Sequence, residues 1–141
     1  MNAVIVGGGK VGSHLAKILA GRGAKVVVIE ENMARCDLIK DEMAAAGVQL
    51  IHGDGDEPAV LDAAGIRSAE VVVAATGHDE DNLVVSLLGK REYNVPTTLA
   101  RVNNPRNAWL FTERFGVDET VSSTAAMVDV LEGCCGGKLS D

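Results

Sequence analysis

The residues with the clearest chemical potential are three glycines and one acid near the N-terminus. Gly7, Gly9 and Gly12 form the pattern Gly-x-Gly-x-x-Gly at the end of an apolar run, and Glu30 closes the next apolar run. Gly7 permits a tight strand-to-helix turn, Gly9 lets the backbone approach a diphosphate, and Gly12 lets the helix pack close to the sheet. The diphosphate would face the N–H groups and the positive dipole end of that helix, while Glu30 would accept hydrogen bonds from ribose hydroxyls. The set predicts a nucleotide site, because a merely flexible turn needs only one or two such glycines.

Small or charged residues also stand at the ends of later apolar runs. The third run ends in Gly53-Asp54-Gly55-Asp56 and the fourth in Ala75-Thr76-Gly77-His78, and their small residues would let a flat ring and a phosphate lie against the backbone. Asp54 could accept a hydrogen bond from an adenine amino group, or it could cap the helix that follows. Lys10 and Arg101 would place one cation on each side of a diphosphate. The alternatives are a solvated lysine and a structural ion pair of the arginine.

The elements that must position these residues follow from apolar periodicity. Short continuous runs, typical of buried strands, predict strands at 2–6, 25–30, 48–52, 70–75, 98–102 and 118–121. Longer patterns predict helices at 10–21, 32–46, 57–64, 81–93, 105–115 and 124–133. In helix 81–93 we expect an apolar stripe of Leu83, Val84, Leu87 and Leu88.

This alternation predicts an α/β fold. With right-handed crossovers it gives a Rossmann-like, doubly wound, parallel six-stranded sheet of order 3-2-1-4-5-6 in three layers. A ligand would lie across the carboxyl ends of strands 1 and 4, where the strand order reverses.

Size and composition narrow the function. A chain of 141 residues provides one domain with a real core but no second substrate-binding domain. Hydrophobic residues at 47% and aromatic residues at only 3% suit an aliphatic parallel sheet covered by helices. The net charge of −7 argues against a nucleic-acid partner. No apolar stretch approaches the roughly 20 residues of a membrane span, and the first strand begins too early for a signal peptide, so we expect a cytoplasmic protein.

Residues that could bind a metal do not form a convincing site. Cys36 and the adjacent Cys134 and Cys135 favour a reduced compartment over disulfides or metal binding. The cluster Asp79-Glu80-Asp81 is interpreted as a solvated helix start. His52 and His78 end strands 3 and 4, which are separated by roughly 14 Å at the usual strand spacing, so they cannot share a metal.

Several segments together resemble one known family. Beyond the loop at 4–12 and Val-x-x-Ile-Glu at 26–30, they read Gly-Asp-x-x-x-Pro-x-x-Leu-x-x-Ala-Gly-Ile at 53–66 and Ala-Glu-x-Val-Val-Ala-Ala-Thr-Gly-x-Asp-Glu-x-Asn at 69–82. Ala-Arg-Val-Asn-Asn-Pro at 100–105 and Phe-Gly-Val-Asp at 115–118 follow. In this order the segments resemble the regulatory domain of potassium transport called RCK, KTN or TrkA-N. The resemblance covers nearly the whole chain, and generic dehydrogenases lack the segments at 53–66 and 69–82.

The resemblance implies a regulatory function and a set of ligand residues. Such domains lie at the cytoplasmic face of potassium channels and transporters, assemble as homodimers or rings, and gate ion flow when NAD(H) or, alternatively, ATP, ADP or AMP binds in the cleft. The carried-over ligands are Gly7, Gly9, Lys10, Val11, Gly12, Glu30, Gly53, Asp54, Thr76, Gly77 and Arg101. Gly8, Glu31, Gly55 and Ala75, beside them at the same strand ends, complete the candidate site.

Three departures from the family pattern qualify this set. Many relatives carry arginine where this chain has Lys10, and we expect the lysine to make a weaker contact with a phosphate. ATP-binding members can place a metal-binding glutamate after the sixth strand, where this chain has Ser122-Ser123-Thr124, so we expect no metal. We expect a nucleotide-binding domain at 1–134 and a flexible tail at 135–141, without the family's C-terminal regulatory domain.

Two other functions remain open. A small NAD-dependent oxidoreductase would need a proton donor in the cleft, but Tyr93 is followed at the fourth position by Thr97 and not by lysine. A stand-alone nucleotide sensor unrelated to potassium is the other alternative. We predict no enzymatic activity.

Two predicted helices carry the residues for assembly. Helix 124–133 presents Met127, Val128, Val130 and Leu131, and helix 105–115 presents Trp109, Leu110 and Phe111. Bulky apolar residues are favoured at interface centres, although both helices could instead cover the sheet edge. We therefore predict at least a homodimer and a membrane potassium transporter as the target.

Overall fold

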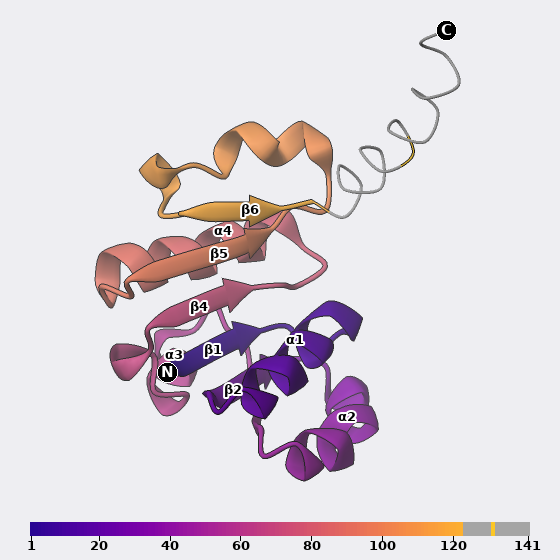
Figure 1. Ribbon diagram of the computed structural model, residues 1–141. Helices are drawn as coiled ribbons and strands as arrows, with labels where there is room; N and C mark the ends of the chain where they lie inside the picture. Colours follow the sequence, from indigo (N-terminus) through magenta and orange to yellow (C-terminus); the bar gives the residue numbers. More distant parts are fainter. Residues whose placement is uncertain (123–130, 132–141) are drawn as a thin grey trace, which may run out of the picture.

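The fold is a single parallel sheet with helices on both faces (Figure 1). The computed structural model describes residues 1–122 and Leu131. The strands are β1 (Asn2–Val6), β2 (Lys25–Glu30), β3 (Gln49–His52), β4 (Val71–Ala74), β5 (Thr97–Arg101) and β6 (Glu119–Val121). The helices are α1 (Lys10–Gly21), α2 (Met33–Ala45), α3 (Pro58–Ala63) and α4 (Asp79–Leu87). A π-helix, η2 (Leu88–Glu92), and three 3-10 turns, η1 (Ile66–Ser68), η3 (Pro105–Leu110) and η4 (Glu113–Phe115), complete the described elements.

The strand order is β3-β2-β1-β4-β5-β6, with parallel pairing throughout, which confirms the predicted topology. Val6 at the end of β1 pairs with Ile29 of β2 and with Ala74 of β4, so three strands end at nearly the same level. The loops that follow them therefore share one edge of the sheet, the edge toward which the arrows of Figure 1 point. Because β2 and β4 lie on opposite sides of β1, the chain leaves this edge in two directions and opens a crevice there.

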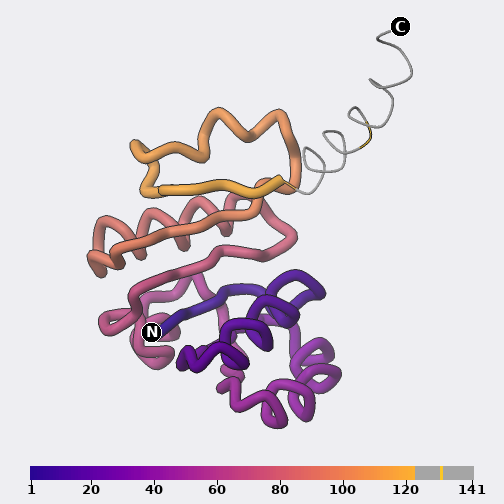
Figure 2. Tube along the Cα trace, in the orientation of Figure 1, coloured from indigo at the N-terminus to yellow at the C-terminus, as the bar shows by residue number. Residues whose placement is uncertain are grey.

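The core lies on both faces of the sheet, and the trace in Figure 2 shows the helices on either side of it. Alternate residues of β1 point to opposite faces: Val4 and Val6 pack with Leu61 of α3 and Val85 of α4, while Ile5 packs with Ala16 of α1 and Met43 of α2. Both faces of the central strands are thus covered, which explains their continuous runs of valine and isoleucine. The predicted three-layer arrangement is confirmed.

The prediction of one helix at 105–115 is wrong. The segment forms two separate 3-10 turns, because Phe111 leaves helical geometry with ψ at 72° and its side chain is buried in the core. Phe111 is therefore a core residue and not the interface anchor we expected, whereas Trp109 on η3 is 72% exposed. Predicted helix 124–133 falls outside the described residues except for Leu131, whose side chain is exposed.

The expected apolar stripe of helix 81–93 is confirmed for two of its four residues, since Leu83 and Leu88 are partly buried against the core. The helix begins at Asp79, and its fully buried residues are Asp79, Asn82, Val85, Ser86 and, in η2, Gly89. Two of the expected stripe residues, Val84 and Leu87, are exposed instead. Apolar periodicity alone does not locate the buried face, because Asn82 and Ser86 are polar. Their polar groups have hydrogen-bond partners inside the protein: the Ser86 hydroxyl donates to the Asn82 carbonyl at 2.8 Å.

Candidate nucleotide-binding cleft

A cleft of about 750 Å³ lies at the carboxyl edge of the sheet. This volume is typical of sites for small molecules and cofactors. Most of the residues that the sequence singled out line it, from the glycine loop and from the ends of β2, β3, β4 and β5. They are Gly7, Gly9, Lys10, Val11, Glu30, Glu31, Gly53, Asp54, Gly55, Ala75, Thr76, Gly77 and Arg101. Gly8 and Gly12 do not line the cleft; their contacts are with Glu30 and with the Gly7 carbonyl group.

The three glycines of the loop have different structural roles. Gly7 has a φ of +112°, and a Cβ there would lie 2.7 Å from the Ala75 carbonyl oxygen. A Cβ on Gly12 would overlap the carbonyl oxygen of Gly7, so α1 packs against the loop only without a side chain there. A Cβ on Gly9 would meet only the Arg35 guanidinium, at 3.6 Å. Gly7 and Gly12 are thus required by the fold, whereas Gly9 leaves room for a ligand.

The start of α1 is open toward the cleft. Gly9 is its N-cap residue and has no side chain with which to accept from the first-turn N–H groups. Those groups have no acceptors within the helix, and they carry the positive end of the helix dipole. The cleft therefore contains donors suited to an anionic oxygen.

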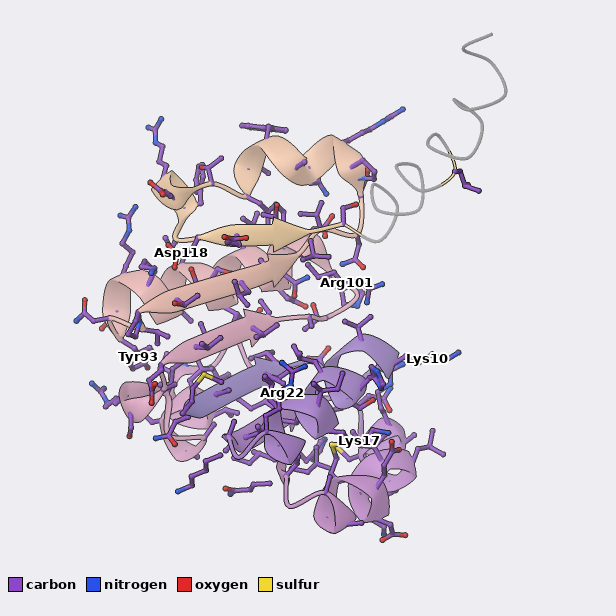
Figure 3. All side chains as sticks on the ribbon, viewed as in Figure 1. Lys10, Lys17, Arg22, Tyr93, Arg101 and Asp118 are labelled. Atoms are coloured by element: carbon purple, nitrogen blue, oxygen red, sulfur yellow. The ribbon has the colours of Figure 1, made fainter. Side chains whose placement is uncertain are left out.

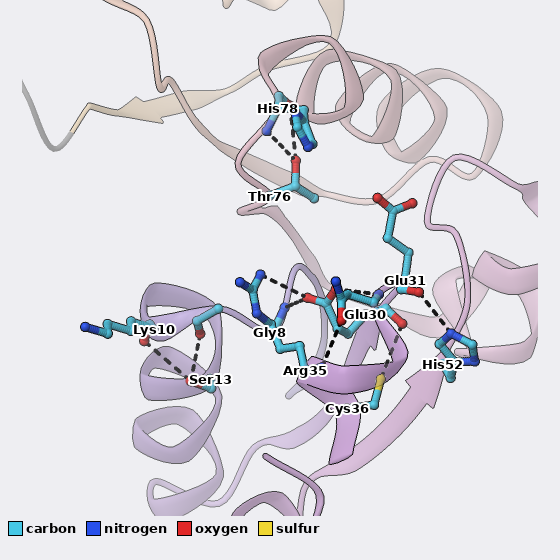
Figure 4. Close-up of polar contacts among 12 residues, drawn as sticks. Gly8, Lys10, Ser13, Glu30, Glu31, Arg35, Cys36, His52, Thr76 and His78 are labelled. Carbon is cyan, nitrogen blue, oxygen red and sulfur yellow. Dashed lines mark hydrogen bonds and ion pairs between the residues drawn. The ribbon is translucent and has the colours of Figure 1, made fainter. Parts of the chain in front are cut away.

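Glu30 holds the glycine loop in place (Figure 4). Its side chain is 5% exposed, and its Oε1 accepts from the Gly8 N–H at 2.8 Å. Its Oε2 accepts from the Asn32 N–H, also at 2.8 Å. From the sequence we assigned Glu30 only to the ribose. Its bond from the Gly8 N–H is a second role, and it explains why Gly8 does not line the cleft. A carboxylate has about four acceptor positions, so these two bonds leave acceptor capacity for ribose hydroxyls.

An asparagine joins the two strand ends on the opposite wall. Asn82 Oδ1 accepts from the Thr76 N–H at 3.0 Å and from the Thr76 hydroxyl at 2.7 Å. Its Nδ2 donates to the carbonyl oxygens of Thr76 at 3.1 Å and of Arg101 at 2.9 Å. The buried Asn82 of α4 thereby fixes the residues that follow β4 relative to the end of β5.

The acidic cluster begins α4, as expected, but its first residue is buried and not solvated. Asp79 is 6% exposed and accepts from the N–H groups of Asn103 and Asn104 at 2.6 and 2.9 Å and from Asn107 Nδ2 at 2.8 Å. Burial raises the pKa of Asp79, but these hydrogen bonds outweigh burial and hold the pKa below its ordinary value. Asp81 lines the cleft, and Glu80 is exposed.

Asp54 shapes its own loop. Its Oδ1 accepts from the Asp56 N–H at 2.8 Å. The alternative that Asp54 caps α3 is wrong, because the N-cap residue of that helix is Glu57.

The cations of the cleft come from three elements. Lys10 projects from α1 and Arg101 extends from the end of β5 (Figure 3), while Arg35 reaches the cleft from α2. Arg101 Nε is buried and has no hydrogen-bond partner among the described residues. An orphaned donor of this kind is costly unless a ligand or water satisfies it. Together with the open space at Gly9, it fits the phosphate oxygens of a nucleotide.

The ligand set predicted from the sequence omitted several residues that line the cleft, chiefly Asn32, Arg35, Asp56, His78 and Asp81. Asp56 follows Asp54 in the same loop, and the others lie in first helical turns or just before them. Loops and first helical turns that follow parallel strands lie at the carboxyl edge of the sheet. The predicted topology could therefore have identified these residues as part of the cleft.

Asp56 gives the cleft a pH response. Burial, followed by a hydrogen bond and charge repulsion from Asp81, raises the pKa of Asp56 from 3.8 to about 7. Between these values the folded protein binds more protons than the unfolded chain, so the free energy of unfolding falls as pH rises through that window. Asp56→Asn should flatten this fall in urea denaturation at pH 5 and pH 8. Glu80→Gln, which removes an exposed acid outside the cleft, should retain it, and an unchanged pH response in Asp56→Asn would contradict the assignment.

Comparison with known proteins places this geometry in a family. The TrkA-N domain family matches residues 3–123. The chain belongs to the TrkA-N domain family. Over 135 residues it is 38% identical to the Trk system potassium uptake protein TrkA of Mycobacterium tuberculosis, covering 94% of this chain and 58% of that protein. Over 132 residues it is 39% identical to a TrkA homolog of Methanothermobacter thermautotrophicus, covering 94% and 59%. This TrkA-N domain therefore spans less than two thirds of the length of these relatives.

Solved structures share the fold of this TrkA-N domain at low sequence identity. The TrkA-N domain of the inner membrane protein ybaL from Escherichia coli superimposes with a TM-score of 0.80 at 19% identity, over 94% of this chain and 95% of that one. The GsuK channel bound to NAD gives 0.71 at 21% identity, over 85% and 21%. GsuK bound to ADP gives 0.72 at 21%, over 86% and 31%. None of the helices in the described part of this TrkA-N domain has the length and apolarity to cross a membrane.

Proposed function

We propose that this TrkA-N domain is a nucleotide-sensing regulatory domain of a potassium uptake system, with NAD(H) as its ligand and ATP, ADP or AMP as the alternative. The observation that carries the proposal is the start of α1, where uncapped N–H groups face the open space beside Gly9. The relatives named as potassium uptake proteins support the system, and the NAD and ADP complexes of GsuK support the ligand class.

Each wall of the cleft has a role in this proposal. The first-turn N–H groups of α1 bind the diphosphate, and Lys10 and Arg101 balance its charge. Glu30 accepts from the ribose hydroxyls through the lone pairs that its two backbone bonds leave free. Asp54 and Thr76, at the ends of β3 and β4, flank the adenine ring, and the neighbouring small residues form its walls. These are Gly53, Gly55, Ala75 and Gly77.

The regulatory part of the proposal concerns partners. Residues 1–134 would act at the inner face of the membrane, bound to a potassium transporter or channel subunit, as a homodimer or a larger ring. A ligand can change such an assembly only by binding one of its arrangements more tightly than another. The cleft suits this role because its walls come from both halves of the sheet, and the exposed Trp109 offers a bulky apolar contact.

Calorimetry of the purified domain tests the ligand. We expect NADH or ADP to bind, and we expect NADPH to bind about tenfold more weakly than NADH, because the Glu30 carboxylate repels a 2′-phosphate. Mass spectrometry of copurifying material then distinguishes NAD(H) from adenosine nucleotides. Absence of binding for NADH, ADP, ATP and AMP would refute the proposal, and steady oxidation of NADH with a simple carbonyl substrate would refute its regulatory part.

A further inference from the structure

We propose that Arg35 is a specificity-determining residue, which sets together with Glu30 how strongly the cleft discriminates between a ribose 2′-hydroxyl and a 2′-phosphate. The inference rests on the proposed function, since it requires a nucleotide in the cleft. It adds a cationic contact at the ribose edge to a site in which Lys10 and Arg101 were the only cations foreseen.

The position of the guanidinium carries this inference. Arg35 Nη1 lies 3.8 Å from Glu30 Oε1, and it lies 3.6 Å from the point where a Cβ on Gly9 would stand. The guanidinium is therefore close both to the acid that we assign to the ribose, as Figure 4 shows, and to the glycine that we assign to the diphosphate. A ligand that contacts both of these residues must pass beside Arg35.

The backbone of Arg35 is fixed while its charged group is available. Its N–H donates at 3.0 Å to Oδ1 of Asn32, the N-cap residue of α2, which holds the first turn of that helix. Its side chain is 52% exposed, and its guanidinium makes no hydrogen bond within the described part of the chain. The separation from Glu30 is that of a loose ion pair, so the five N–H donors of the guanidinium can turn to an anion.

Opposing charges meet at the ribose edge. Glu30 and Glu31 repel a 2′-phosphate, which carries more negative charge than either carboxylate. Arg35 and the positive end of the 13-residue helix α2 attract it. Discrimination at the 2′ position is the difference between these effects, so Glu30 alone does not set it. Removal of Arg35 should increase discrimination, and removal of the Glu30 charge should decrease it.

Titrations with NADH and NADPH, which differ only at the 2′ position, test the inference. In Arg35→Gln we expect the ratio of the NADPH to the NADH dissociation constant to rise about tenfold, because a charge-assisted contact to the 2′-phosphate is lost. Lys40→Gln is the matched control, since Lys40 lies on the same helix, is exposed and does not line the cleft. Its ratio should equal that of the unaltered domain.

A second pair of variants keeps the test independent of weak NADPH binding. Glu30→Gln should lower the ratio, and Glu30→Gln with Arg35→Gln should raise it again; thermal melting of each variant verifies folding. An unchanged ratio in Arg35→Gln, including equal weakening of both ligands, would overturn the inference and leave the proposed function standing. Failure of the unaltered domain to bind any nucleotide would refute the proposed function itself.

Discussion

Replacement of Gly9 by valine is expected to abolish nucleotide binding while the domain remains folded. Gly9 has a φ of −69° and a ψ of −168°, which any residue can adopt, so valine introduces no backbone strain. Its side chain would instead fill the space beside the first turn of α1 that the diphosphate needs. We expect calorimetry with NADH and ADP to detect no binding, and we expect circular dichroism and thermal melting to resemble those of the unaltered domain.

Two other glycines provide the controls for this experiment. Gly12→Ala should destabilise the fold, by about 3 kcal/mol, because its Cβ would overlap the Gly7 carbonyl oxygen and α1 would have to move. Gly21→Ala should preserve both folding and binding, since no atom lies within 4 Å of its Cβ position. Native affinity in Gly9→Val would show that the ligand does not use this loop.

Replacement of Asp79 by alanine is expected to lower the free energy of unfolding by about 3 kcal/mol. The substitution would leave the N–H groups of Asn103 and Asn104 and the amide of Asn107 without their buried acceptor. Urea denaturation measures the loss. Glu80→Ala is the matched control, because Glu80 is the next residue on the same helical turn and its side chain is exposed. Equal unfolding midpoints for the two variants would contradict the structural role of Asp79.

Acid should expose the same interaction. The pKa of Asp79 is lower in the folded protein than its ordinary value of 3.8. Its contribution to stability is therefore present above that ordinary value and is lost as pH falls through the lower value in the folded protein. Asp79→Ala should lack this part of the acid sensitivity.

The sheet and most of the cleft were predictable because each depends on a simple pattern. Buried parallel strands such as β1 and β2 are continuous apolar runs, and the spacing from Gly7 to Gly12 reflects steric limits that the structure retains. The direction of the chain at each strand end then determines which residues meet.

The remaining features depend on tertiary contacts that leave little trace in local patterns. Asn82 and Ser86 are of residue types that are usually exposed, yet both are buried here, because their polar groups form hydrogen bonds inside the protein. Phe111 interrupts the predicted helix because its ring is buried in the hydrophobic core. Glu30 serves the loop as well as the cleft, a role that appears only when Gly8 is placed beside it.

The exposed Trp109 gives the molecule a built-in optical signal. It is the single tryptophan of the chain, so all indole emission comes from η3, the turn that Asn107 ties to Asp79. With 72% of its surface in contact with solvent, the indole should emit at the long wavelengths of a hydrated ring and should be quenched readily by iodide or acrylamide. A protein surface that covers η3 would shift that emission to the blue and protect it from quenching. Fluorescence of the unlabelled chain therefore reports directly on what this face of the domain meets.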